Sequence, residues 1–349
     1  MSKTDAGRFL EDFRIGETIR HATPRTVSTA DATLYAALYG SRFAVQSSDV
    51  FARSLGYPAS PLDDWLVFHM VFGKTVPDIS INAVANLGYA DGRFLKPVFP
   101  DTTLLAVSEV IGVKESSSRQ TGVVYVRSTG FDETGDAVLS YCRWVLVRKR
   151  DEAASLREEH VPDLPKAVAP DRLGAACPQL APGAYNTVLA GSPYRFGDYA
   201  VGERIDHVDG MTVEEAEHQL ATRLYQNTAK VHFDLFAAQS GRFKRRLIYG
   251  GHVISLARAL SFNGLANAFH VAAINGGRHV APLFAGDTVY AWSEVLDRAE
   301  ISGRSDVGAL RLRQVATKNR PCGDFPLKTG EAYGSDVILD LDVWVLLPR

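Results

Sequence analysis

The segment from Asn227 to Asp234 carries the side chains best suited to moving a proton. His232 can act as a general base, because the unperturbed pKa of an imidazole, roughly 6.5, lies near working pH. Asn227 can orient a water molecule, but an amide cannot accept its proton. Either His232 works alone or a carboxylate from elsewhere assists it, and Asp234 and the pair Asp63–Asp64 are the candidates.

A glycine further along the chain could stabilise negative charge. Gly251 lies at the expected N-terminus of an apolar helix. There a free backbone N–H and the positive end of the helix dipole can both face an oxygen that gathers charge. Glycine also permits close approach of the backbone to a ligand. A base and an amide donor could thus act together on a substrate with a carbonyl group.

The elements that must position these residues belong to a sequence repeat. The second copy follows the first at an offset of 185 residues, and the closing segments are offset by about 200 because copy two carries an insertion, Asn319 to Gly334. The matching segments are Asp49–Ala52 with Asp234–Ala237, Gly92–Phe99 with Gly277–Phe284, and Arg143–Leu146 with Val343–Leu346. We therefore predict two domains, 1–150 and 193–349, joined by a Pro-rich linker, 151–192, with one short helix near 151–159.

Each copy has the same predicted order of elements. A first helix (28–39 and 213–226, the latter capped by Thr212) precedes a longer apolar helix (61–76 and 250–264). The longer helix of copy one is apolar all round, which is typical of a buried helix. Alternating strands follow at 104–113, 120–129 and 137–148, and at 289–296, 309–317 and 337–347. The pattern predicts an α+β protein in which each copy wraps a curved antiparallel sheet around a buried helix, the hot-dog arrangement.

The residues around His232 resemble the hydratase motif of the MaoC-like, R-specific enoyl-CoA hydratases, in which a Gly-Asp pair precedes Asn-Pro-x-His. His232 takes the position of the catalytic histidine, and Asn227 takes that of the usual aspartate. Gln226, Ala229 and Lys230 replace the Gly, Asn and Pro. Downstream, 247–253 matches the family's apolar-His-Gly-Met segment, with Gly251 at the glycine. The resemblance implies a tandem hot-dog fold and addition of water to an enoyl thioester.

The run 61–90 and the two-copy layout resemble, more narrowly, the mesaconyl-CoA hydratase family, also called β-methylmalyl-CoA dehydratases. This resemblance implies reversible dehydration of (2R,3S)-β-methylmalyl-CoA to mesaconyl-CoA, in the ethylmalonyl-CoA route and glyoxylate assimilation. His232 would be the base, and the Gly251 N–H would face the thioester oxygen. No cofactor is implied, because coenzyme A is part of the substrate.

Further residues are expected to bind this substrate. Tyr249 and Gly250 precede Gly251, and Lys230 could pair with the carboxylate that ends the acyl group. Lys244 and Arg245 could receive the phosphates of coenzyme A, although a solvated loop is an equally good interpretation.

Copy one is expected to lack this chemistry. Ser47 and Arg42 stand at the positions of His232 and Asn227, and Asp64 corresponds to Gly251 in the repeat. We therefore expect copy one to form a wall of the acyl tunnel. His69 and His252, on the two apolar helices, are interpreted as core residues.

Three alternatives remain open from the sequence. The substrate could be another enoyl-CoA, the protein could be a hot-dog thioesterase, or it could bind acyl thioesters without catalysis. Hot-dog thioesterases usually have a carboxylate near the helix start, and Gly250 and Gly251 supply none in copy two.

Composition limits the partners. A formal net charge of −2 with 22% charged residues gives no reason to expect nucleic acid or a membrane surface. Three cysteines without metal-ligand spacing indicate reduced thiols and a cytoplasmic protein with no metal site. Edge-to-edge pairing of the two sheets could occur within one chain, and a homodimer or larger homo-oligomer remains open.

Overall fold

The computed structural model describes residues 3–181 and 183–349. The first half contains β1 (Thr18–Arg20), β2 (Arg25–Thr26), α1 (Thr29–Tyr39), α2 (Ala44–Ser47), α3 (Asp49–Leu55), α4 (Asp64–Thr75), β3 (Ala83–Phe94), β4 (Thr103–Glu115), β5 (Thr121–Phe131) and β6 (Ala137–Arg148). A π-helical turn, Val76–Ser80, extends α4. The short α5 (Thr187–Ala190) lies between the halves.

The second half repeats this order. It contains β7 (Arg204–Thr212), α6 (Glu215–Leu224), α7 (Lys230–Phe233), α8 (Leu235–Gln239), α9 (Gly250–Leu260), α10 (Phe262–Leu265), β8 (His270–His279), β9 (Thr288–Glu300), β10 (Val307–Lys318) and β13 (Val337–Pro348). The predicted insertion folds as a small hairpin of β11 (Lys328–Thr329) and β12 (Ala332–Tyr333).

One antiparallel sheet spans both halves. Its strand order is β1-β4-β5-β6-β3-β8-β13-β10-β9-β7, and β2 also pairs with β4. The halves meet at β3 and β8, where Tyr89 pairs with Gly277 and Gly92 with Ile274. The two sheets therefore pair edge to edge within one chain, which confirms that expectation.

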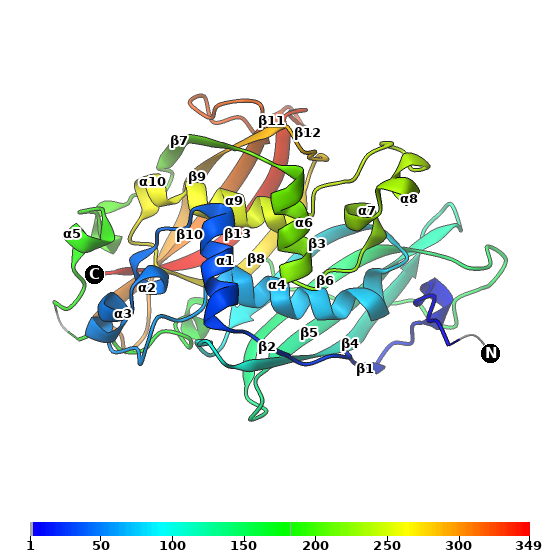
Figure 1. Ribbon diagram of the computed structural model, residues 1–349, viewed down its shortest axis with the longest axis horizontal. Coiled ribbons are helices and arrows are strands. Elements are labelled where there is room, and N and C mark those ends of the chain that lie inside the picture. Colours follow the sequence, from blue (N-terminus) through cyan, green and yellow to red (C-terminus); the bar gives the residue numbers. More distant parts are fainter. Residues whose placement is uncertain (1–2, 182) are drawn as a thin grey trace.

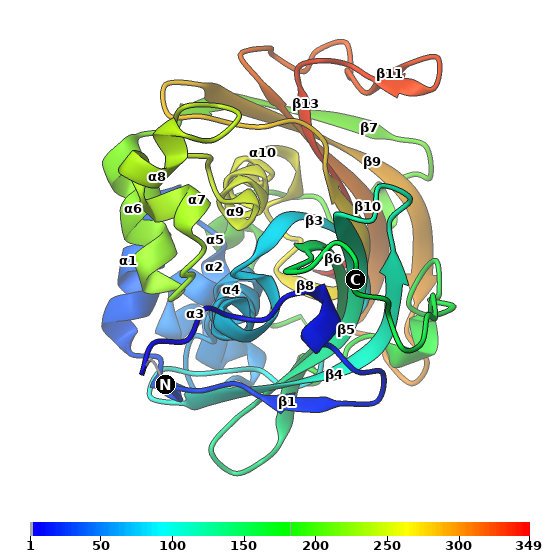
Figure 2. The same cartoon turned by 90° about the vertical axis from the view of Figure 1, so that its right-hand side faces the viewer.

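The helices α4 and α9 form the central layer. Figure 2 looks nearly along both, and they lie between the curved sheet and the outer helices α1, α6, α7 and α8. Every residue from Trp65 to Thr75 of α4 is buried, as its apolar pattern predicted. The two helices contact each other through a hydrogen bond of 3.0 Å between His69 Nε2 and Ser255 Oγ. The double hot-dog arrangement is thus confirmed.

Two local predictions were wrong, and two strands were missed. No helix forms at 151–159. Thr212 does not cap α6, because it ends β7, and α6 begins at Glu215 without a side-chain cap. The strands β3 and β8 were not predicted, although they join the two halves (Figure 1).

Candidate active site

The start of α9 is shaped around two glycines. A Cβ added to Gly251 would collide with the rings of Tyr249 and His69, and one added to Gly250 would collide with the ring of His279. The first N–H groups of a helix have no partner within it, and they lie at the positive end of its dipole. The glycines therefore let neighbouring side chains pack closely around the free amides of the helix N-terminus.

His232 lies beside this helix start. It is buried on the short helix α7, and its ring centroid is 5.5 Å from that of Tyr249. Its Nδ1 is 2.7 Å from the carbonyl oxygen of Leu247, which can only accept, so Nδ1 carries the hydrogen and Nε2 keeps a lone pair. Burial lowers the pKa of His232 to about 4, which keeps the ring neutral near pH 7. The structure thus places a neutral imidazole and Gly251 beside the same side chain, the ring of Tyr249.

Asn227 is buried just before α7. Its Oδ1 accepts the N–H of Ala229 at 3.0 Å, so the amide supports the turn that leads into the helix.

The candidate carboxylates are engaged elsewhere. Asp234 caps α8 through the N–H of Ala237, and Asp63 caps α4 through the N–H of Trp65. Asp64 is bonded to His270 and to the N–H of Val271. Each carboxylate therefore has a structural partner of its own, away from His232.

The basic residues named from the sequence lie on the surface. Lys230 and Lys244 are exposed, and Arg245 donates to the carbonyl of Ala285 while its Cζ lies 4.4 Å from the centre of the Phe284 ring. These positions leave Lys230 and Lys244 accessible to a ligand outside the protein core.

Several site residues were missed by sequence reasoning because they come from other elements. His218 of α6 accepts the N–H of Tyr249 at 2.9 Å through its Nε2. His279, at the end of β8, faces Gly250, and its Nε2 is 3.2 Å from the hydroxyl of Tyr89. The repeat places Phe94 at the position of His279, and this difference is the signal that the sequence offers for that residue.

The two histidines interpreted as core residues differ in their surroundings. His252 is buried and bonded to the hydroxyl of Tyr39 through Nδ1 at 2.9 Å, which confirms its interpretation. His69 is also buried, but its Nδ1 is 3.4 Å from the Tyr249 hydroxyl. His69 of copy one therefore contacts the Tyr249 side chain next to the start of α9.

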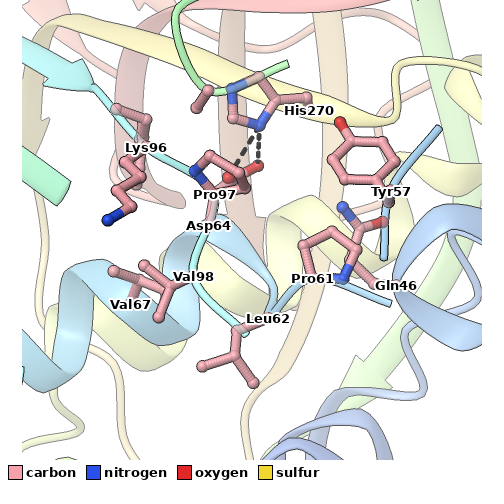
Figure 3. Close-up of a pocket in the computed structure, with 12 residues that line it drawn as sticks. Gln46, Tyr57, Pro61, Leu62, Asp64, Val67, Lys96, Pro97, Val98 and His270 are labelled. Atoms are coloured by element: carbon pink, nitrogen blue, oxygen red, sulfur yellow. Dashed lines mark hydrogen bonds and ion pairs between the residues drawn. The ribbon is translucent and has the colours of Figure 1, made fainter. Parts of the chain in front are cut away.

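The helix start of copy one has an imidazole beside it that comes from copy two. Figure 3 shows a pocket there in which His270 of β8 meets Asp64, with 2.8 Å between Nδ1 and Oδ1. Gln46, Tyr57 and Leu62 are among the other lining residues. The offset within the repeat could not reveal this imidazole, because the other copy supplies it.

Within the described residues, no cluster of three or more His, Cys, Asp or Glu side chains has metal-binding geometry. None of the helices in residues 3–181 and 183–349 is long and apolar enough to cross a membrane.

Known proteins resemble this chain over its whole length. The family described as mesaconyl-CoA hydratase matches residues 1–330. The chain is 59% identical to a β-methylmalyl-CoA dehydratase of Chloroflexus aurantiacus, over 100% of this chain and 99% of that protein. It is 61% identical to a mesaconyl-CoA hydratase of Cereibacter sphaeroides, over 99% of this chain and 100% of that one.

Solved structures show the same fold. A MaoC domain protein from Chloroflexus aurantiacus, 58% identical, superimposes with a TM-score of 0.98 over 100% of this chain and 99% of its own. A Mycobacterium tuberculosis protein with a double hot-dog fold, 23% identical, gives a TM-score of 0.73 over 98% of this chain and 99% of its own.

Proposed function

Because the chain belongs to the mesaconyl-CoA hydratase family, we propose that it is a hydro-lyase that reversibly dehydrates (2R,3S)-β-methylmalyl-CoA to mesaconyl-CoA. Relatives of 59–61% identity over the full chain carry both names of this reaction. The observation that supports the assignment within the structure is the bond from His232 Nδ1 to Leu247, which leaves Nε2 free to act as a base on a ring that lies beside Tyr249, the N-cap residue of α9.

The hydration step follows from this arrangement. His232 Nε2 takes a proton from water while the water oxygen bonds to the β-carbon of mesaconyl-CoA. The electron pair of the double bond moves toward the thioester carbonyl, and the Gly251 N–H stabilises the oxygen that becomes negative. The imidazolium then returns the proton to the α-carbon, so the addition is complete without a second acid. Dehydration is the reverse sequence.

His232 needs no carboxylate in this account. The three carboxylates considered from the sequence are bonded to other groups, and Asn227 holds a turn. The carbonyl oxygen of Leu247 holds the His232 ring in its orientation, which is the task that a carboxylate performs in other enzymes.

Thioester hydrolysis is the second candidate. Asp64 stands at the start of α4, where a thioesterase carboxylate would be expected. However, its Oδ1 faces His270 and its Oδ2 accepts the N–H of Val271, so both oxygens already have a structural partner, which disfavours a role in activating water.

One assay separates the candidates. The protein is incubated with mesaconyl-CoA while enoyl absorbance and free thiol are followed together. Loss of absorbance without thiol supports the hydratase, and thiol release supports a thioesterase. Silence with mesaconyl-CoA but turnover of crotonyl-CoA would assign another enoyl-CoA, and silence with both would assign a non-catalytic binder.

We propose further that the enzyme acts in the cytoplasm as a homodimer or a larger homo-oligomer. Its three cysteines are buried free thiols, which suits a reducing compartment. Size-exclusion chromatography with light scattering measures the assembly state directly.

A further inference from the structure

Arg143 is a fully buried cation without an acidic partner. It lies on β6 and is only 1% exposed. One guanidinium nitrogen donates to Thr75 Oγ1 at 2.8 Å, and its Cζ lies 4.2 Å from the centre of the Phe72 ring. Its Nε and Nη1 have no hydrogen-bond partner, and among the described residues no carboxylate pairs with it. Because a buried unpaired charge is costly, such a group calls for a ligand that compensates it.

Arg258, the other buried arginine among the described residues, has nearby carboxylates that compensate its charge. Arg258 of α9 also lies over a phenylalanine, with its Cζ 3.6 Å from the centre of the Phe43 ring. Burial lowers the pKa of Arg258, but the charges of Asp63 and Asp64 oppose that shift. Burial likewise lowers the pKa of Arg143, and only tyrosines oppose it.

The fold itself does not require a cation at this position. In the repeat, Arg143 corresponds to Val343, and the strand pairing agrees, since Arg143 faces Tyr89 as Val343 faces Ile274. Val343 is buried too, so an apolar side chain fills the equivalent site in copy two. The guanidinium is thus an addition specific to copy one.

The sheet connects Arg143 to the candidate active site. Tyr89 pairs with Arg143 on one side and with Gly277 on the other, so these residues share a face across three strands, roughly 10 Å. His279 follows Gly277 by two residues, bonds to the Tyr89 hydroxyl and faces Gly250. Phe72, beneath the guanidinium, has its ring centroid 5.8 Å from that of Tyr249. A line of side chains therefore runs from the start of α9 to Arg143.

We propose that Arg143 binds the carboxylate at the far end of the acyl group, so that copy one selects dicarboxylic acyl thioesters for the site of copy two. The inference rests on the proposed function for the position of the thioester. The unpaired N–H groups on Nε and Nη1 can each donate a charge-assisted hydrogen bond to a carboxylate oxygen. The sequence pointed to Lys230 for this task, but Lys230 is exposed on α7.

The test measures binding and so does not depend on turnover. Succinyl-CoA and butyryl-CoA both carry four-carbon acyl groups, and they differ in a terminal carboxylate against a methyl group. Calorimetric titration of the wild type is expected to show tighter binding of succinyl-CoA than of butyryl-CoA. Arg143→Met is expected to weaken the binding of succinyl-CoA by at least about 10²-fold and to leave the affinity for butyryl-CoA unchanged. Arg143→Lys keeps a positive charge but loses the Nε and Nη1 donors of the guanidinium, and we expect it to retain part of the preference.

Two further variants sharpen the result. Arg258→Met removes an equally buried guanidinium and should affect both thioesters alike. Lys230→Met tests the competing cation, and loss of the preference in that variant with retention in Arg143→Met would overturn the proposal. If Arg143→Met does not fold, an unchanged preference in Arg143→Lys would overturn it equally. A wild type without any preference would do so as well.

The outcome is separable from the proposed function. Hydration of mesaconyl-CoA by the wild type tests the reaction, whatever Arg143 does. The wild type could bind succinyl-CoA preferentially through Arg143 and yet leave mesaconyl-CoA unchanged. That result would support the carboxylate-binding site and exclude the proposed reaction.

Discussion

The Nδ1 atom of His232 lies 2.7 Å from the carbonyl oxygen of Leu247, and this contact determines which ring nitrogen can act as a base. Because a carbonyl oxygen only accepts, the hydrogen stays on Nδ1, and Nε2 is free to take a proton. Burial also favours the neutral ring. The ring is therefore held neutral with the Nε2 lone pair available, as the proposed role of a base requires.

The pH dependence of the reaction should reflect this burial. His232 must be neutral to act, and its pKa is lowered to about 4. We expect kcat/KM for mesaconyl-CoA to stay level from neutral pH to about pH 5 and to fall by half near pH 4. Short assays after a pH jump, with circular dichroism at each pH, check this. An acid limb centred near 6.5 in protein that is still folded would contradict it.

Stability should fall in the same pH range. Burial lowers the pKa of His69, His207, His218, His232, His252 and His279, all to about 4 or below. Below pH 6.5 the unfolded chain binds protons at these positions and the folded protein does not. Stability is therefore full above about pH 6.5 and is lost as pH falls toward 4, by up to ~1.4 kcal/mol per pH unit for each histidine. Thermal melts from pH 8 to 4.5 measure the slope, and a flat Tm would contradict the prediction.

The glycine at the start of α9 should not tolerate a side chain. In Gly251→Ala the new methyl group would collide with Tyr249 and His69, which must move away from the site. We expect a loss of about 1–3 kcal/mol in stability and a fall of more than tenfold in kcat/KM. Gly197→Ala is the matched control, because a Cβ there meets nothing within 4 Å. Equal activity in the two variants would exclude the crowded helix start as a functional feature.

Much of the fold could be predicted because long patterns encode it. The repeat gave the two-copy layout, and an unbroken apolar run gave α4. The strands β3 and β8 could not be predicted because both contain several Gly and Ala residues and lack an alternation of apolar and polar residues. Their strand character comes from pairing with each other, which no local pattern records.

The false helix at 151–159 shows how tertiary contacts override propensity. The segment contains three Glu, two Ala and one Leu, residues that favour a helix. In the structure Glu159 pairs with Lys114 at 2.5 Å, and His160 forms a bridge with Val113. The end of this segment therefore lies beside β4 and does not form a helix.

The candidate site also contains residues that the sequence could indicate and residues that it could not. His232 and Gly251 could be named as candidates because each lies in a local motif. His279, His69 and Arg143 come from a strand end, from the helix of copy one and from β6, and only the folded sheet brings them near Tyr249. The repeat holds a signal for Arg143 and for His279, since it places Val343 and Phe94 at their positions.

Replacement of His232 by alanine tests the central claim most directly. We expect His232→Ala to lower kcat for mesaconyl-CoA hydration by at least about 10²-fold while the fold persists. His207→Ala is the matched control, because His207 is also buried in the second half and bonds a backbone carbonyl through Nδ1 at 2.7 Å. It should lose stability but keep kcat within about threefold. Near-normal turnover in folded His232→Ala would contradict the account and move the base elsewhere.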